Sequence, residues 1–316
     1  MSILTTIVAA SAAILISSAT FSDFSDNNGL PLDSIPSVDL PELDWAKIFA
    51  EDAQRSRKDE APRFAIPHEV RISPATDGIW ERIDRNTMRW SLRIGSQNAI
   101  SLNLGFGHWQ LPRSAELTIA TTDGEFALRP FTADDNKPHG ELWTPVLPSD
   151  EIIIEIIVAN REQHLVNNGV LLSSINVGYR GFYEQGVDRS GSCNYDVVCP
   201  EGDDWWNEIP CVAVISTGGS TFCTGFMVNN TSQDRTPYFM TANHCGVNSS
   251  SAPSLVTYWN YQNSYCRVPG SGDSGGSGDG QLNQFNTGAT HLTSGSFSDY
   301  TLVVMNNSPD DAWEVS

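Results

Sequence analysis

TFCTGFMVNNTSQDRTPYFMTANHC, from Thr221 to Cys245, carries the clearest structural pattern in the chain. Two segments rich in β-branched and aromatic residues, Thr221–Val228 and Pro237–Met240, are joined by a polar turn. This pattern predicts two neighbouring strands. The second segment runs almost directly into His244 and Cys245. We therefore expect a histidine that is held at the exit of a strand.

His244 is a candidate catalytic base. A base must lie within hydrogen-bond reach of the proton that it takes, so its backbone must be held in place. A disulfide from Cys245 to Cys223 on the neighbouring strand would hold it, and closing that loop would contribute about 3 kcal/mol on chain-entropy grounds. Taken alone, a histidine before a cysteine is more often structural.

A second segment, Ser296–Val304, reads SFSDYTLVV, and its apolar strand opens at Asp299. We expect the Asp299 carboxylate to be partly buried, and a buried carboxylate requires a partner. The imidazole N–H of His244 is such a partner, and the pair would set the histidine tautomer for general-base work. Taken alone, an aspartate that starts a strand is usually a turn residue.

The six cysteines all lie between residues 193 and 266. None of their spacings is C-x-x-C and no H-x-x-x-H follows, so disulfides in an oxidising compartment fit better than a zinc site. The 316 residues suffice for about two domains. Because 38 acidic residues against 18 basic ones give a net charge of −20, the chain repels phosphate backbones and anionic lipid, which excludes nucleic-acid binding.

The N-terminal residues indicate export. Residues 3–19 form an apolar stretch that ends in Ser17-Ser18-Ala19, which predicts a secretory signal peptide over residues 1–19 and a secreted protein, extracellular or periplasmic. An uncleaved membrane anchor is the alternative, although Ala, Ser and Thr make the stretch less hydrophobic than a typical span. Residues 20–62 are polar, acidic and proline-containing, which predicts a tether with one short helix near Leu43–Arg57.

Residues 63–185 predict an all-β module of the β-sandwich kind, since short β-prone segments alternate with Gly, Pro, Asn and Asp turns. The expected strands are Thr87–Ile94, Ala99–Phe106, Ala115–Thr121, Glu151–Ala159 and Val170–Val177. Its histidines are scattered and no paired carboxylates flank a groove, so we interpret the module as structural. Residues 186–316, which hold all the cysteines, form the second domain.

TANHC and SDYTL together resemble the trypsin-like serine endopeptidases, and the flanking runs are similar to the bacterial lysyl endopeptidase family. These runs are SGSCNYDVVCPEGD (Ser190–Asp203), CTGFMVNN (Cys223–Asn230), YFMTANHCG (Tyr238–Gly246) and VTYWNYQNSYCR (Val256–Arg267). GELWTPVLPSDE (Gly140–Glu151) and VGYRGF (Val177–Phe182) are similar to the propeptide of that family. The resemblance covers most of residues 80–310.

The resemblance implies an exported precursor in which a β-sandwich-like propeptide precedes the N-terminal β-barrel of a chymotrypsin/trypsin-like hydrolase. Its substrates would be polypeptides and its own propeptide a partner, with no nucleic acid, no membrane after signal removal, and no metal or organic cofactor. His244 would be the general base and Asp299 its orienting acid. The resemblance also implies the disulfides Cys223–Cys245 and Cys199–Cys266. Cys193 and Cys211 remain, and they either form a disulfide with each other or have partners that are encoded further on.

The nucleophile of a trypsin-like triad follows the aspartate and lies on a second barrel. Residues 186–316 suffice for one barrel only, so we expect the sequence to stop before the nucleophile and the chain as given to be inactive. Residues 272–276 read GDSGG, but Ser274 precedes Asp299 in a flexible Gly/Ser tract whose composition produces this run readily, so we interpret it as a decoy. The alternatives are a hydrolase that uses Ser274 and a non-catalytic peptide-binding module. Cleavage near Arg189 would separate propeptide from barrel.

Overall fold

The computed structural model describes residues 30–55, 60–181, 193–274 and 278–309. In these ranges the regular secondary structure is mostly β-strand and forms three sheets, with two α-helices, α1 (Trp45–Gln54) and α2 (Gln163–Gly169). The predicted all-β class is therefore confirmed. None of the described helices is long and apolar enough to cross a membrane. The signal peptide expected at residues 1–19 and the cleavage expected near Arg189 lie outside the described residues.

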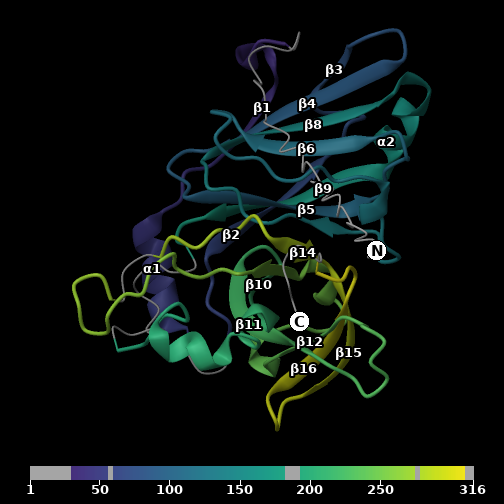
Figure 1. Cartoon of the computed structure of the whole chain (residues 1–316). Helices are drawn as coiled ribbons and strands as arrows, with labels where there is room; N and C mark the ends of the chain where they lie inside the picture. Colours follow the sequence, from purple (N-terminus) through teal and green to yellow (C-terminus); the bar gives the residue numbers. More distant parts are fainter. Residues whose placement is uncertain (1–29, 56–59, 182–192, 275–277, 310–316) are drawn as a thin grey trace, which may run out of the picture.

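The first two sheets form a sandwich, in the upper half of Figure 1. One sheet has the order β1-β4-β8-β6 with β3 on β4, and its strands are β1 (Ser37–Leu40), β3 (Ile79–Arg82), β4 (Thr87–Ser96), β6 (Glu116–Thr121) and β8 (Glu151–Ala159). The other has the order β2-β9-β5-β7, and its strands are β2 (Ala65–Ile72), β5 (Ser101–Trp109), β7 (Leu142–Trp143) and β9 (Val170–Gly178). The five strands expected from the sequence are all present.

Strand β8 shows why these residues form a sandwich. Ile152, Ile154 and Ile156 alternate along the strand and are fully buried in the core that the two sheets share. Ile153, on the opposite face, packs against Ile35. The opposite face is covered only in part, since Ile157 further along it is exposed. The continuously buried core face therefore fixes the position of the strand.

The prediction of a tether was wrong for residues 30–55. Strand β1 pairs in parallel with β4 at Arg93–Ser96, and helix α1 buries Ile48. The sequence pattern missed β1 because only Val38 and Leu40 in its four residues are apolar, which is too short for a periodic signal. The helix expected near Leu43–Arg57 is α1, and Asp44 caps its N-terminus by accepting a hydrogen bond from the Lys47 N–H.

The third sheet has seven strands in the order β14-β13-β10-β11-β12-β16-β15 and curls into a barrel in the lower half of Figure 1. Its strands are β10 (Val212–Thr217), β11 (Thr221–Val228), β12 (Tyr238–Thr241), β13 (Val256–Trp259), β14 (Phe285–Thr287), β15 (Ala289–Gly295) and β16 (Tyr300–Met305). The barrel has its own core, in which Phe239 packs edge-on against Trp259. Strand β11 has the bounds that the sequence predicts, and β12 begins one residue later.

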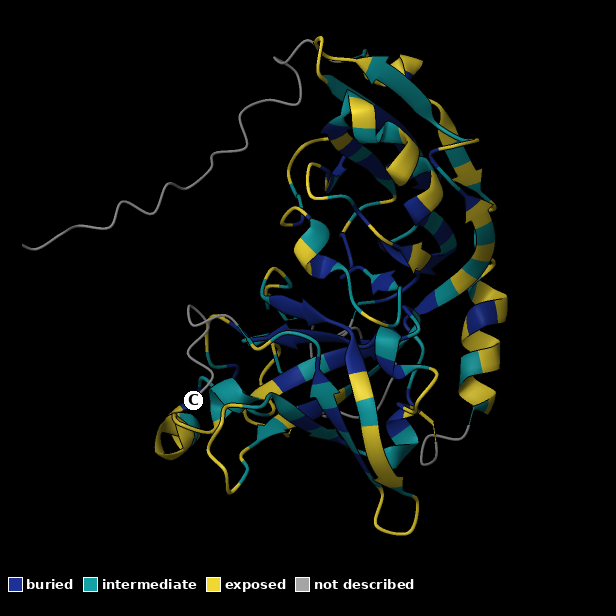
Figure 2. Cartoon of the chain, turned by 90° about the vertical axis from the view of Figure 1, so that its right-hand side faces the viewer, coloured by how far each residue is buried: buried dark blue, intermediate teal, exposed yellow. Residues whose placement is uncertain are grey.

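The sandwich and the barrel pack directly on each other. Tyr258 of β13 is fully buried in the sandwich core, and its hydroxyl accepts a hydrogen bond from the Val146 N–H. The Asn103 side chain donates to the carbonyl of Gly219, which has a left-handed φ of 63°. Buried segments accordingly continue across the junction (Figure 2).

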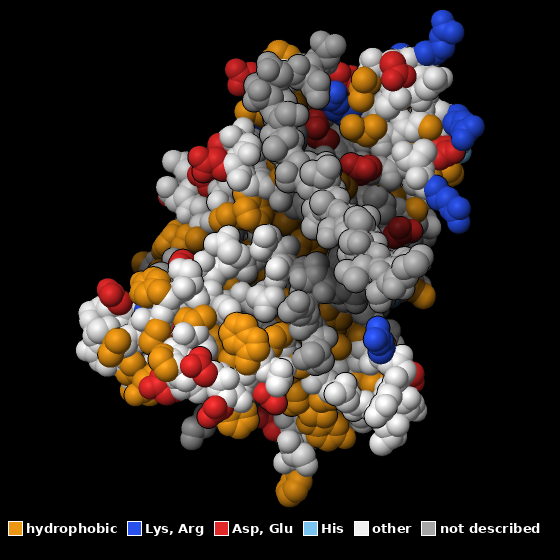
Figure 3. Space-filling view, in the orientation of Figure 1, with side chains coloured by type: hydrophobic (Ala, Val, Ile, Leu, Met, Phe, Trp, Pro, Cys, Tyr) orange, Lys and Arg blue, Asp and Glu red, His pale blue; other side chains and the backbone are white. Residues whose placement is uncertain are grey.

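The barrel exposes more large apolar side chains than the sandwich does. Hydrophobic surface is visible over the lower part of the molecule in Figure 3. Exposed residues of this kind in the barrel domain include Tyr195, Trp205, Trp206, Tyr265, Val268 and Phe297.

Candidate active site

A pocket of about 650 Å³ lies beside the barrel, where three segments of the chain meet. The first segment connects α1 to β2, the second runs from β11 to the short 3-10 turn after β12, and the third joins β15 to β16. The residues that line the pocket are Arg55, Glu60, Ala61, Thr221, Asn243, His244, Cys245, Gly246, Ser296 and Asp299. His244 and Asp299, the two catalytic candidates from the sequence, are therefore in one pocket.

The position of His244 is fixed by the turn that contains it and by the disulfide of its neighbour Cys245. It lies in a single 3-10 turn, Asn243–Cys245, that directly follows β12. Gly246 closes the turn in a left-handed conformation with a φ of 77°, and its N–H donates to the Asn243 carbonyl. The disulfide between Cys245 and Cys223 ties the turn to β11. The strand exit and the disulfide expected from the sequence are both present.

Asp299 makes two contacts with His244. Its Oδ2 lies 2.8 Å from Nδ1 of the imidazole, and its Oδ1 accepts a hydrogen bond of 2.9 Å from the backbone N–H of His244. A carboxylate can only accept, so Nδ1 carries the proton in this arrangement. The Nε2 atom is then the basic nitrogen of the neutral ring. The hydrogen bonds from the His244 side chain and backbone hold the pKa of Asp299 below its usual value.

The Asp299 carboxylate is more open than the sequence predicts. The side chain is 51% exposed, whereas that of His244 is 29% exposed. Asp299 lies in the turn between β15 and β16 with a left-handed φ of 48°, so it precedes the buried part of the strand. Its position depends on the two hydrogen bonds rather than on surrounding apolar residues.

The cysteines are paired as the family resemblance implies. Cys199 and Cys266 form the second disulfide, next to the ion pair between Asp196 and Arg267, whose closest atoms are 2.7 Å apart. Neither Cys193 nor Cys211 is in a disulfide. The structure therefore lacks the Cys193–Cys211 disulfide that was one of the two alternatives for these residues.

One group of potential metal ligands includes His244. Atoms of Cys223, His244 and Cys245 lie within 4.8 Å of one another. The two sulfurs are bonded in the disulfide, and a disulfide supplies no thiolate, the form of cysteine that binds metals. This group therefore does not fit a metal site.

Ser274 and Ser296 differ in their position relative to this pocket. Ser274 lies in the connection between β13 and β14, and it is not among the described residues that line the pocket. Ser296 does line it but was not singled out in the sequence, although it stands three residues before Asp299. Arg55, Glu60 and Ala61 were also missed, because no local pattern reveals that the segment before β2 folds against the barrel.

A curled all-β barrel with a histidine–aspartate pair at its edge is typical of the chymotrypsin-like class. Residues 187–315 match the family described as lysyl endopeptidase, C-terminal domain. A lysyl endopeptidase of Pseudomonas aeruginosa is 29% identical over a region that covers 42% of this chain and 30% of that protein. The chain thus spans less than a third of the length of this relative, and its second domain is similar to a peptidase.

Proposed function

We propose that residues 186–316 form the N-terminal barrel of a serine endopeptidase of the lysyl endopeptidase family. His244 is the general base and Asp299 the residue that orients it. The observation that carries the proposal is the double contact between them, 2.8 Å from side chain to side chain and 2.9 Å from carboxylate to backbone. The match of residues 187–315 to that family supports the assignment independently.

The geometry is suited to acyl transfer. With its Nδ1–H directed at Asp299, His244 presents Nε2 to accept the proton of a serine hydroxyl as the serine oxygen attacks the carbonyl carbon of a peptide bond. The imidazolium that forms is stabilised by the adjacent carboxylate. Nε2 then returns the proton to the leaving amine, and water hydrolyses the acyl-enzyme by the same proton transfers. The substrates are polypeptides.

The proposal assigns the nucleophile to neither serine discussed above. Ser274 is not among the described residues that line the His244 pocket, and the structure has no hydrogen bond between the Ser296 hydroxyl and the imidazole within the described part of the chain. We accordingly propose that the chain as given does not hydrolyse peptide bonds, and that a serine outside it completes the triad.

The disulfides and the sandwich bear on how the protein is exported and processed. Two disulfides suit an oxidising compartment, which supports secretion into the periplasm or the medium after removal of a signal peptide at residues 1–19. The sandwich, which packs on the barrel through Tyr258 and Gly219, is proposed to be the propeptide, and the whole chain to be a zymogen-like precursor.

A fluorophosphonate probe, which reacts with activated serines, tests the proposed function. We expect no labelling of the chain as given. In a longer product from which the sandwich has been removed by processing, we expect labelling of one serine, and this label should be lost in His244→Ala. A matched His108→Ala variant, altered in the sandwich, should keep the label. Labelling of Ser274 in the chain as given, or labelling that survives His244→Ala, would overturn the assignment.

A further inference from the structure

One edge of β11 is shared between the barrel and another part of the chain. On one side β11 pairs with β10 along Thr221–Phe226. On the other side β12 pairs with β11 only along Gly225–Val228. The first residues of β11 are therefore not covered by β12.

A segment from the start of the sandwich lies along this edge. The carbonyl of Pro62 accepts a hydrogen bond of 3.0 Å from the Phe222 N–H, and the Phe64 N–H donates to the Ser220 carbonyl at 2.8 Å. Arg63 and Thr221 form an antiparallel bridge between these two bonds. This is the pattern in which an extended peptide adds a strand to the edge of a sheet.

The paired segment also reaches the candidate active site. Thr221, on the edge of β11, lines the same pocket as His244, and so does Ala61, the residue just before the paired segment. Two residues further along β11, Cys223 is bonded to Cys245, the neighbour of His244. Any extended chain on this edge therefore passes beside the imidazole.

We propose that Ser220–Phe222, here called the docking edge, binds extended polypeptide by backbone pairing. In this chain Ala61–Phe64, here called the blocking strand, occupies that edge and excludes other polypeptides from it. The inference rests on the proposed function, because it assigns a substrate-binding element to the same site. Backbone pairing recognises the extended shape of a polypeptide and leaves most of its side chains unspecified, which suits a site that acts on many sequences.

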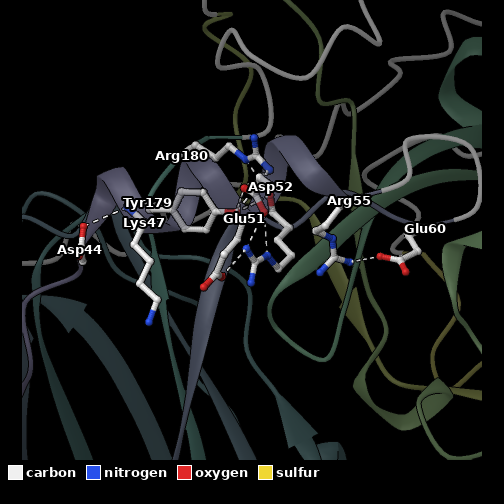
Figure 4. Close-up of polar contacts among 9 residues, drawn as sticks. Asp44, Lys47, Glu51, Asp52, Arg55, Glu60, Tyr179 and Arg180 are labelled. Atoms are coloured by element: carbon white, nitrogen blue, oxygen red, sulfur yellow. Dashed lines mark hydrogen bonds and ion pairs between the residues drawn. The ribbon is translucent and has the colours of Figure 1, made fainter.

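A cluster of charged groups positions the blocking strand (Figure 4). Asp52 of α1 pairs with Arg63 of the blocking strand at 2.7 Å and with Arg180, just after β9, at 2.9 Å. The Tyr179 hydroxyl also donates to Asp52. The side chains of Asp52 and Arg180 are only 10% and 7% exposed. Removing one partner of such a buried ionic group leaves the others uncompensated, so Asp52 holds α1 and the blocking strand together.

Apolar packing adds to the backbone pairing. Phe64 is almost fully buried, and its ring lies 6.4 Å from that of Phe222 in an edge-on arrangement. Arg55 and Glu60, which both line the pocket, form an ion pair of 2.8 Å. The blocking strand is thus fixed at both ends, by α1 before it and by β2 after it.

Peptide binding to the full chain tests the proposal without requiring hydrolysis. The probe is a fluorescein-labelled peptide, EAPAFAI, which has the sequence of residues 60–66 with alanine in place of Arg63, so its own affinity does not depend on the ion pair with Asp52. The measurement is fluorescence anisotropy. We expect Asp52→Ala to bind the probe about tenfold more tightly than the unaltered chain, because the edge is vacated more often. Asp33→Ala, which alters an exposed carboxylate of the same N-terminal region, should bind like the unaltered chain.

A second probe distinguishes backbone pairing at the docking edge from non-specific binding. N-methylation of the residue equivalent to Phe64 removes the donor to the Ser220 carbonyl, so this peptide should lose most of its affinity. Equal binding of both peptides, or no gain in Asp52→Ala while circular dichroism shows an intact fold, would overturn the proposal. If Asp52→Ala does not fold, Asp52→Asn, which keeps an acceptor for Tyr179, is measured in its place with the same expected direction.

The outcomes for the two proposals are distinguishable. Loss of fluorophosphonate labelling in His244→Ala together with no peptide binding in the Asp52 variant would reject the docking edge alone. Peptide binding together with labelling that ignores His244 would reject the catalytic assignment and leave the docking edge as a peptide-binding surface.

Discussion

The carboxylate of Asp299 holds both the ring and the backbone of His244, with Oδ2 2.8 Å from Nδ1 and Oδ1 2.9 Å from the backbone nitrogen. One contact alone would leave the imidazole able to turn about its side-chain bonds. Two contacts fix the turn Asn243–Cys245 and the ring together, so the position of Nε2 follows from the position of Asp299. Most of the expected behaviour of the site follows from this pairing.

The contact between these residues should depend on pH. The hydrogen bonds from His244 lower the pKa of Asp299, so the ionised carboxylate stabilises the folded state at pH values above its unfolded pKa of about 4. This contribution is lost as the pH falls through the lower folded pKa. We expect the difference in unfolding free energy between the unaltered chain and Asp299→Asn to be constant near neutral pH and to shrink in acid. Urea unfolding at several pH values measures it, and a difference that grows in acid would contradict the assignment.

The Cys223–Cys245 disulfide should stabilise the barrel as well as position His244. Replacing both cysteines by alanine releases a loop with a sequence separation of 22, which should lower the unfolding free energy by about 3 kcal/mol. Urea denaturation measures this loss. As a control, Cys193→Ser changes an exposed cysteine that is not in a disulfide and should alter stability by no more than about 0.5 kcal/mol. A double variant as stable as the control would show that the disulfide contributes little.

Two neighbouring glycines test the junction of sandwich and barrel. Gly218 and Gly219 both have left-handed φ angles, 59° and 63°, so alanine should cost about 1 kcal/mol at each. At Gly218 a Cβ meets nothing within 4 Å, whereas at Gly219 it would lie 2.2 Å from Asn176 Nδ2 and 2.4 Å from Asn103 Oδ1. Gly219→Ala should therefore be clearly less stable than Gly218→Ala in thermal unfolding. Equal losses would mean that the sandwich does not pack on this turn as described.

A histidine at the same junction should make the folded chain less stable in mild acid. Burial lowers the pKa of His139, whose Nδ1 accepts from the Glu141 N–H and whose Nε2 lies 2.7 Å from Asn306 Nδ2 in the barrel domain. Since the unfolded chain binds a proton more readily, stability is complete above the unfolded pKa of about 6.5 and falls as the pH drops below it. The loss of unfolding free energy from about pH 7.5 to pH 5.5 should be smaller in His139→Gln than in the unaltered chain. Identical losses would show that His139 does not contribute.

The strands were predictable where the pattern was local. Glu151–Ala159 and Val170–Val177 carry enough β-branched residues to be recognised without any partner, and β8 and β9 begin at the same residues. The contact between His244 and Asp299 was also predicted, in part from the resemblance to a known family. The exposure of the Asp299 side chain was not predicted, because the position of a residue at the start of a strand gives no information on what covers it.

Contacts between distant segments could not be predicted. Strand β1 depends on Arg93–Ser96 for all its pairing, and its own four residues carry little signal. The same holds for the bridge between Arg63 and Thr221, which joins the two domains. Such pairings depend on how distant segments come together in the complete fold, so the periodicity of either segment alone does not predict them.

The ring nitrogens of His244 provide the most direct test of the catalytic assignment. Nitrogen-15 NMR of the full chain at about pH 9, where imidazoles are neutral, distinguishes the two tautomers. The account predicts a proton on Nδ1 and a bare Nε2 in the unaltered chain, with a shift toward the Nε2–H tautomer in Asp299→Asn while the signals of His291 stay in place. A His244 ring that carries its proton on Nε2 in the unaltered chain, or one that is insensitive to Asp299→Asn, would contradict it.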